Sequence, residues 1–198
     1  MTGIIVLIRH AAHADLGQIL SGRTPGIPLS DDGRRQAAAL AEHMAGQDLA
    51  AVHTSPVQRA RETADAIRSV RDVPCVTVDA LQEIDFGAWT GRSFAELDGR
   101  PDWTDWNRDR GSARAADGET MAEAQARIVH HIEQVARDHA GETVAMVSHC
   151  DLIRAAIAHY LGLPLACLLN FDVDPASFSR LAVGDWGGRV LSINETAS

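Results

Sequence analysis

The sequence predicts an α/β fold with a mainly parallel central sheet. Short segments rich in β-branched residues alternate along the chain with segments of helical pattern, and this alternation is typical of parallel sheets. The chain has 198 residues, which is enough for one domain with a substantial core. It contains no internal repeat, low-complexity tract or linker rich in Ser or Gly. We therefore expect a single domain over residues 1–198.

The N-terminal half predicts two strands, each followed by a helix. We expect a strand over 3–9, a Gly- and Pro-rich loop over 21–30, a helix from Ser30 to about Gly46, a strand over 50–54 and a helix from Ser55 to about Val70. Ser30 and Ser55 belong to a residue type that caps helix N-termini. Pro56 would then occupy the first helical position, where its missing N–H group is not needed.

The C-terminal half continues the alternation after an irregular segment. We expect strands over 75–79 and 142–149, helices over about 119–139 and 151–161, and a closing hairpin of 177–183 and 188–194 around Gly187-Gly188. Residues 85–118 hold three of the four tryptophans and many Gly, Asp and Arg residues, which predicts a partly helical, lid-like excursion. Trp103 and Trp106 form either a small core within it or a contact with an apolar ligand.

Charge and composition argue against several classes of protein. The formal net charge is -9, so the chain should repel nucleic acids and anionic membranes. No segment approaches the roughly 20 apolar residues that span a bilayer, and we expect no secretion signal. Cys75, Cys150 and Cys167 lie far apart without a CxxC pair, which predicts reduced thiols in a cytoplasmic protein. All 18 basic residues are arginines, whose planar fork suits phosphate.

Chemically active side chains stand at the ends of four predicted strands. The carboxyl ends of parallel strands meet at one edge of a sheet, where functional groups gather. These side chains are Arg9 and His10 after the first strand, Arg59 one turn beyond the second, Glu83 beyond the third and His149 after the fourth. The order of the chain thus predicts two histidines, two arginines and one carboxylate at a single edge.

This set of groups suits the transfer of a phosphoryl group. A neutral imidazole is a good nucleophile toward phosphorus, and two guanidinium groups can neutralise the oxygens of the transferring group. A second histidine adds a hydrogen-bond donor, and a carboxylic acid can protonate a leaving alkoxide and then activate water. Because this chemistry requires no metal ion or organic cofactor, we expect neither.

Six segments of the chain resemble the histidine phosphatase superfamily, also called the phosphoglycerate mutase-like family, and in particular its phosphatase branch. They are LIRHAAHAD at 7–15, GRTPGIPLSDDGRRQA at 22–37, TSPVQRARETA at 54–64, LQEIDFGAWTGRSFAEL at 81–97, DGETMAEAQARI at 117–128 and VAMVSHCDLIRAAI at 144–157. The resemblance covers nearly the whole chain. It implies the three-layer α/β/α sandwich of phosphoglycerate mutase-like proteins.

The resemblance also implies a role for each residue at the edge of the sheet. His10 would be the nucleophile that carries a transient phosphoryl group, and Glu83 would be the proton donor to the leaving group. Arg9, Arg59 and His149 would form the phosphate pocket around His10. Members of this kind use no metal or organic cofactor.

Residues 11–22 depart from the family pattern. Ala11 and Ala12 stand where the signature has Gly and Glu, Leu16 replaces a polar residue, and Ser21-Gly22 replaces Gln-Gly. Three interpretations stay open: a more apolar phosphoester as substrate, contacts from other polar side chains, or reduced activity. The glycine missing at position 11 matters most if that position requires an unusual backbone dihedral.

The polar side chains that we expect to bind substrate are His13, Ser21 and Arg23, with Gln18 as a further option. Arg23 lies in a Gly- and Pro-rich loop close to the predicted edge. It is either a solvated loop residue or a clamp on a carboxylate or second phosphate of the substrate.

The leading hypothesis is a phosphomonoesterase that works through a phosphohistidine. The alternatives are a phosphoglycerate mutase, which would have to retain a bisphosphate, and a catalytically weak phosphoester-binding protein. A metal-dependent hydrolase with His10, His13 and His149 as ligands is a further option. The short chain favours a phosphatase over a mutase. The partner would be a small phosphoester, not nucleic acid or a membrane, and the oligomeric state stays open, with a homodimer as one option.

Overall fold

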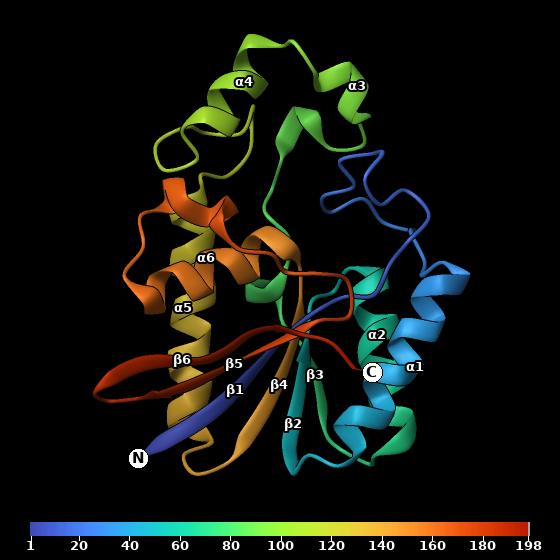
Figure 1. Ribbon diagram of the computed structural model, residues 1–198, viewed down its shortest axis with the longest axis vertical. Coiled ribbons are helices and arrows are strands. Elements are labelled where there is room, and N and C mark those ends of the chain that lie inside the picture. Colours follow the sequence, from blue (N-terminus) through green and yellow to red (C-terminus); the bar gives the residue numbers. More distant parts are fainter. Residues whose placement is uncertain (198) are drawn as a thin grey trace.

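Six strands form one mixed sheet at the centre of the molecule. The structure is a computed structural model that describes residues 1–197 (Figure 1). In chain order the strands are β1 (Thr2–Arg9), β2 (Leu49–Thr54), β3 (Cys75–Thr77), β4 (Thr143–Ser148), β5 (Phe178–Gly184) and β6 (Gly187–Glu195). Their order across the sheet is β3-β2-β4-β1-β5-β6. The first four of these run parallel, whereas β5 is antiparallel to β1 and β6 is antiparallel to β5.

Helices cover both faces of this sheet and make three layers (Figure 1). The helices are α1 (Asp31–Ala45) and α2 (Gln58–Val70) on one face, and α5 (Met121–Asp138) and α6 (Cys150–Leu161) on the other. A 3-10 helix, η3 (Leu165–Asn170), connects α6 to the last two strands. Within residues 1–197, no helix combines the length and the apolar composition needed to cross a membrane.

The central strand β1 shows how the sequence builds both hydrophobic layers. Ile5 and Leu7 pack in the core under α5 and α6, whereas Val6 and Ile8 pack in the core under α1 and α2. A parallel strand between two helical layers is buried on both faces, so its apolar residues form a continuous run and do not alternate with polar ones. The predicted three-layer α/β/α fold is confirmed.

The predicted excursion over residues 85–118 forms a cap beyond the end of the sheet (Figure 1). Its elements are η2 (Gly87–Trp89), α3 (Phe94–Leu97) and α4 (Pro101–Arg108), and a short 3-10 helix, η1 (Asp79–Leu81), precedes it. The rings of Trp89 and Trp106 are buried with their centroids 5.9 Å apart, and Phe86 packs against Trp106 at 6.3 Å. Trp103 lies 5.3 Å from Trp89. The tryptophans of the excursion therefore form a small core, the first of the two arrangements considered above.

The two predicted helix caps differ in outcome. Ser30 caps α1 as expected, because its hydroxyl accepts a hydrogen bond from the N–H of Gly33 at 3.0 Å. Ser55 does not begin α2. Its hydroxyl accepts from the N–H of Val57 at 3.3 Å, the chain stays extended at Val57, and the helix begins at Gln58.

The closing hairpin is displaced slightly from its predicted turn. The two strands are joined by Asp185-Trp186, not by Gly187-Gly188. Gly187 opens β6 with a φ of +106°, a backbone conformation that favours glycine and that turns the chain back along β5. The strand β3 is shorter than predicted and ends at Thr77.

Candidate active site

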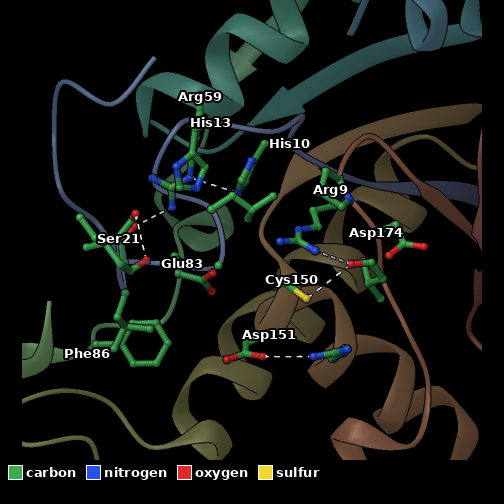
Figure 2. A pocket seen from close by; sticks show the side chains of 18 of the residues that line it. Arg9, His10, His13, Ser21, Arg59, Glu83, Phe86, Cys150, Asp151 and Asp174 are labelled. Carbon is green, nitrogen blue, oxygen red and sulfur yellow. Dashed lines mark hydrogen bonds and ion pairs between the residues drawn. The ribbon is translucent and has the colours of Figure 1, made fainter. Parts of the chain in front are cut away.

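A cavity of about 460 Å³ opens at the carboxyl ends of the parallel strands. Figure 2 shows His10, His13 and Arg59 at one end of this cavity, and Cys150 and Asp151 at the other. Arg9, His10, Arg59 and Glu83 all line it, so the structure brings together four of the five residues predicted for the site. The fifth residue, His149, lies directly behind Arg59.

His10 follows β1 and lies at the inner end of the cavity, only 3% exposed. Its Nδ1 is 2.8 Å from the carbonyl oxygen of Ala11, and because a carbonyl only accepts, Nδ1 carries the ring proton. The lone pair is then on Nε2, which accepts from Arg59 Nε at 3.0 Å. Burial, followed by the charges of Arg59 and Arg9, holds the pKa of His10 well below its usual value. His10 is therefore a neutral imidazole with its nucleophilic nitrogen against a guanidinium.

Two guanidinium groups border the cavity beside His10. Arg59 lies in the first turn of α2, and its Nη2 donates to the carbonyl oxygen of Gly22 at 2.7 Å. Arg9 ends β1, and its Nη1 donates to the carbonyl oxygen of Val173 at 2.6 Å. Among residues 1–197, the buried Nη1 of Arg59 and the buried Nε of Arg9 have no hydrogen-bond partner. These remaining N–H groups can bind the oxygens of a phosphate group.

His149 supports Arg59 from behind and is not part of the cavity wall. Its ring is fully buried at the end of β4, 5.1 Å from the ring of His10. Its Nδ1 accepts from Arg59 Nη2 at 3.2 Å, because a guanidinium only donates, and its Nε2 therefore donates to the Ser55 hydroxyl at 2.8 Å. Burial, followed by the charge of Arg59, keeps the pKa of His149 well below its usual value. A direct contact between His149 and phosphate stays a prediction.

Glu83 supplies the carboxyl group at this edge of the sheet and is 8% exposed. Its Oε1 accepts from the N–H of Ile84 at 3.0 Å, which orients the side chain. Burial, and next the negative charge of Asp151, raise the pKa of Glu83 to about 7. The hydrogen bond from Ile84 and the charges of Arg59 and Arg9 act in the opposite direction. A carboxyl group that titrates near neutral pH can both donate and accept a proton.

Ala11 and Ala12 fit the loop after His10 without backbone strain. Three non-glycine residues within 1–197 have a positive φ, and Ala11 is not one of them. The N–H of Ala11 donates to Thr63 Oγ1 at 3.1 Å, and the N–H of Ala12 donates to Gln36 Oε1 at 3.0 Å. The Thr63 hydroxyl in turn donates to the carbonyl oxygen of Arg59 at 2.8 Å. Sequence reasoning missed Thr63, although its position one turn after Arg59 was a usable signal.

His13 and Ser21 line the cavity, as expected for residues that bind substrate. The ring of His13 is 5.6 Å from that of His10, and its buried Nδ1 has no partner among residues 1–197. Burial, followed by the charge of Arg59, lowers the pKa of His13 to about 4, so the ring is neutral. Ser21 Oγ lies 3.4 Å from the carbonyl oxygen of Ile19. Nowhere within residues 1–197 are three His, Cys, Asp or Glu side chains arranged to hold a metal ion.

Arg23, the predicted substrate clamp, does not line this cavity. Its Nε donates to the carbonyl oxygen of Glu83 at 2.7 Å, and its Nη2 pairs with Glu119 at 2.8 Å. These acceptors turn the guanidinium toward the main chain of residues 82–86, which we call the Glu83 segment, and away from the cavity. The Arg23 side chain is 30% exposed and binds protein acceptors outside the wall of the cavity, and a contact with substrate stays a prediction.

Sequence reasoning missed the residues that line the outer half of the cavity. Cys150, Asp151 and Arg154 come from the first turns of α6, and residues 172–175 come from the loop before β5. Cys150 and Asp151 directly follow His149, so their position after a strand end was a signal in the sequence. The loop 172–175 reaches the cavity only because β5 pairs with β1, which local sequence does not reveal.

The comparison with protein families agrees with this geometry. The sequence profile of the histidine phosphatase superfamily (branch 1) matches residues 5–196. The chain belongs to this family. The matched range includes all five residues, from Arg9 to His149, to which the resemblance assigned a role.

Phosphatases with different substrates in their names are similar to this chain over nearly their whole length. Phosphoserine phosphatase 1 of Hydrogenobacter thermophilus is 28% identical over 97% of this chain and 92% of its own. The adenosylcobalamin/alpha-ribazole phosphatase of Escherichia coli is 26% identical over 96% of this chain and 95% of its own. The structure of Bacillus stearothermophilus YhfR superposes with a TM-score of 0.90 at 25% identity, over 96% of both chains. The family and these relatives support a phosphoric monoester hydrolase.

Proposed function

We propose that this protein hydrolyses small phosphate monoesters through a phosphohistidine formed on Nε2 of His10. The observation that carries the proposal is the contact between His10 Nε2 and Arg59 Nε at 3.0 Å in the cavity. A neutral nucleophile there lies among cationic N–H donors, and Glu83 holds an exchangeable proton near neutral pH.

In the first half-reaction, the phosphoryl oxygens bind the free N–H groups of Arg9 and Arg59. The lone pair of His10 Nε2 forms a bond to phosphorus while the bond from phosphorus to the ester oxygen breaks. The carboxyl proton of Glu83 moves to that oxygen, so the product leaves as a neutral alcohol and Glu83 becomes a carboxylate.

In the second half-reaction, water takes the position of the departed alcohol. The Glu83 carboxylate removes one proton from this water as its oxygen attacks phosphorus. The nitrogen–phosphorus bond breaks, and its electron pair returns to Nε2 of His10. Inorganic phosphate leaves, and both the imidazole and the carboxylic acid are restored.

The wall of the cavity offers a mixed environment for the alcohol part of the substrate. Leu16 and Phe94 contribute apolar surface, and Arg154 contributes charge. His13 and Ser21 are our candidates for contacts with the ester or its alcohol. A small organic alcohol with both polar and apolar parts suits this wall. The names of the phosphoserine and alpha-ribazole phosphatase relatives are consistent with such a leaving group.

Hydrolysis of p-nitrophenyl phosphate by the wild type and by His10→Ala tests the proposal, with EDTA present throughout. We expect turnover by the wild type and none by His10→Ala. Rapid quenching with a radiolabelled substrate should leave acid-labile label on the wild type alone. His130→Ala, which alters an exposed histidine on α5, is the control. Turnover that survives in His10→Ala would remove His10 as nucleophile, and turnover that EDTA abolishes would point to a metal.

The same preparations distinguish the alternative functions. A phosphoglycerate mutase would interconvert phosphoglycerates faster when bisphosphoglycerate is added, with negligible release of phosphate. A phosphoester-binding protein would be stabilised against heat by phosphate and would turn over no ester.

We also infer a cytoplasmic location. Cys75, Cys150 and Cys167 are all free thiols in the structure, which suits a reducing compartment. A homodimer stays a prediction, and light scattering on the purified protein would test it.

A further inference from the structure

The dipeptide Gly22-Arg23 connects the phosphate-binding side of the cavity to the segment that carries the proton donor. The carbonyl oxygen of Gly22 accepts from Arg59 Nη2 at 2.7 Å. The next side chain, Arg23, donates from Nε to the carbonyl oxygen of Glu83, also at 2.7 Å. Gly22 thus contacts Arg59, whose guanidinium would bind the phosphate. Arg23, the next residue, contacts the main chain of Glu83, whose carboxyl group would protonate the ester.

Glycine is required at the first of these two positions. Gly22 has a φ of +46°, in the left-handed region that other residues rarely adopt. A Cβ added to it would lie 3.2 Å from the side chains of Phe86 and Thr90 in the excursion. The dipeptide is therefore tightly enclosed, and its contacts with Arg59 and Glu83 occur in one fixed conformation.

Arg127 of α5 and Glu119 complete the hold on the Glu83 segment. Arg127 donates to three carbonyl oxygens within residues 80–83, at distances of 2.8 to 3.2 Å. Glu119 Oε2 accepts from Arg23, from Arg127 and from the N–H of Asp85, all within 3 Å. The side chains of Arg23, Arg127 and Glu119 are less than one-third exposed, which protects these ion pairs from screening.

The Glu83 segment needs such support because it has no regular structure of its own. Between η1, which ends at Leu81, and η2, which begins at Gly87, the chain is neither helix nor strand. A segment of this kind lacks the hydrogen-bond ladder that fixes the backbone of regular elements. The guanidinium groups of Arg23 and Arg127 take the place of that ladder.

We propose that Arg23 is a positioning residue that fixes the place of Glu83 relative to the phosphate bound by Arg59. The inference rests on the proposed functions of these two residues. Proton donation requires the carboxyl group to reach the ester oxygen within hydrogen-bond distance. Arg23 touches neither the ester nor the carboxyl group. It acts through the carbonyl oxygen of Glu83, and Gly22 links this contact to Arg59.

The leaving group of the substrate provides a selective test. An alkyl ester such as glycerol 3-phosphate needs a proton on its leaving oxygen, whereas 2,4-dinitrophenyl phosphate releases a stable phenolate without one. The quantity to compare is kcat/KM, because it reports the steps up to the first release of product. Glu83→Gln gives the reference effect, because it removes the proposed proton donor. General-acid catalysis contributes about 10²–10⁴-fold, so kcat/KM should fall by a factor of this order for the alkyl ester and much less for the dinitrophenyl ester.

We expect Arg23→Ala to impair the same ester as Glu83→Gln, but by a smaller factor. Its loss of kcat/KM should be at least about tenfold larger for the alkyl ester than for the dinitrophenyl ester. Arg114→Ala is the matched control. Arg114 also pairs with a carboxylate, Glu123, and donates to one carbonyl oxygen, that of Gly118, but it does not contact the Glu83 segment. The ratio of the two kcat/KM values should be that of the wild type in this control.

An equal loss for both esters in folded Arg23→Ala, or no loss for either, would overturn the proposal. If Arg23→Ala unfolds below the assay temperature, Glu119→Gln replaces it, because this change keeps the size of the side chain and removes the charge that pairs with Arg23 and with Arg127. Glu119→Gln must then show the same selective loss, or the proposal fails. Absence of any selectivity in Glu83→Gln would instead show that the proposed function of Glu83 is wrong, so the two failures are distinguishable.

Discussion

The guanidinium of Arg59 lies between the imidazoles of His10 and His149, donating to His10 Nε2 at 3.0 Å and to His149 Nδ1 at 3.2 Å. Its positive charge next to both rings adds to their burial and keeps the pKa of each well below the usual value. One side chain thereby keeps the proposed nucleophile unprotonated and offers N–H donors to a phosphate group. Both roles require the delocalised charge and the several N–H donors of a planar guanidinium group.

Arg59→Lys should therefore impair the enzyme although it preserves the charge. We expect kcat/KM for p-nitrophenyl phosphate to fall about 10²-fold or more, because an ammonium group cannot make the same set of directed contacts. Arg61→Lys, at an exposed position of the same helix, is the control and should stay close to the wild type. Steady-state rates near those of the wild type in Arg59→Lys would contradict the proposed role of the guanidinium.

The pH dependence of hydrolysis should follow the ionisation of Glu83. For an alkyl ester, kcat/KM should fall above about pH 7, where this carboxyl group loses the proton that it donates. Protonation of His10 should limit the rate only at a pH well below the usual pKa of histidine. Glu83→Gln should be slower and should lose the alkaline limb of the profile. If that limb persists unchanged in Glu83→Gln, another group is responsible for it.

Asp151→Asn should move the alkaline limb to lower pH. The Asp151 carboxylate is the nearby charge that raises the pKa of Glu83 most, after burial itself. Its removal also leaves its partner Arg110, 3.0 Å away, unpaired, and this positive charge acts in the same direction. We expect a shift of about half a pH unit or more in the profile of kcat/KM. Asp174→Asn, which removes another carboxylate from the cavity wall, should leave the limb in place.

The same ionisation should appear in thermal stability. The pKa of Glu83 is raised from an ordinary value of 4.5 to about 7 in the folded state, so the unfolded chain loses this proton first. Stability from this group is therefore complete below about pH 4.5, is lost as the pH rises to about 7, and stays lost above it. Glu83→Gln avoids the buried charge, so its melting temperature relative to the wild type should be higher at pH 8 than at pH 5. An equal difference at both pH values would contradict the raised pKa.

Thr63 should prove important although it does not line the cavity. Thr63→Val keeps the shape of the side chain but leaves the N–H of Ala11 without its acceptor, which should cost about 1–2 kcal/mol in the free energy of unfolding. Activity should fall as well, because the hydroxyl also joins this loop to the carbonyl oxygen of Arg59. Thr63→Ser retains the hydroxyl and is the control. Denaturant unfolding and p-nitrophenyl phosphate hydrolysis measure the two effects, and wild-type stability in Thr63→Val would refute the first.

The inner end of the site could be predicted because the architecture depends on patterns that lie within the sequence. The apolar run before Arg9 and the one before His149 indicated buried parallel strands, and such strands end at the same edge of a sheet. Chain order alone was then enough to bring His10, Arg59 and Glu83 together. The family resemblance assigned roles to residues that the strand ends had already indicated.

The features that sequence reasoning missed depend on contacts between distant segments. Arg23 looked like a substrate ligand because it lies near the edge of the sheet, but only the folded chain shows that the Glu83 carbonyl and Glu119 compete for its guanidinium. Ser55 looked like a helix cap, yet its hydroxyl also accepts from His149 of a neighbouring strand. Residues 172–175 reach the cavity through the pairing of β5 with β1, a long-range pairing without a local signal.

The hydrogen bonds of Gly22-Arg23 distinguish two parts of the first loop, one constrained by the reaction and one free to vary. The dipeptide joins the groups proposed to carry the chemistry, so a change there should impair every substrate whose leaving group needs a proton from Glu83. Leu16 and Ile19, a few residues earlier, line the same cavity with side chains that form no hydrogen bonds. Mutations at these two positions can accumulate and be selected while the reaction itself is preserved. The protein can thus acquire new substrates by drift in a short stretch of one loop, and directed libraries for altered specificity should begin there.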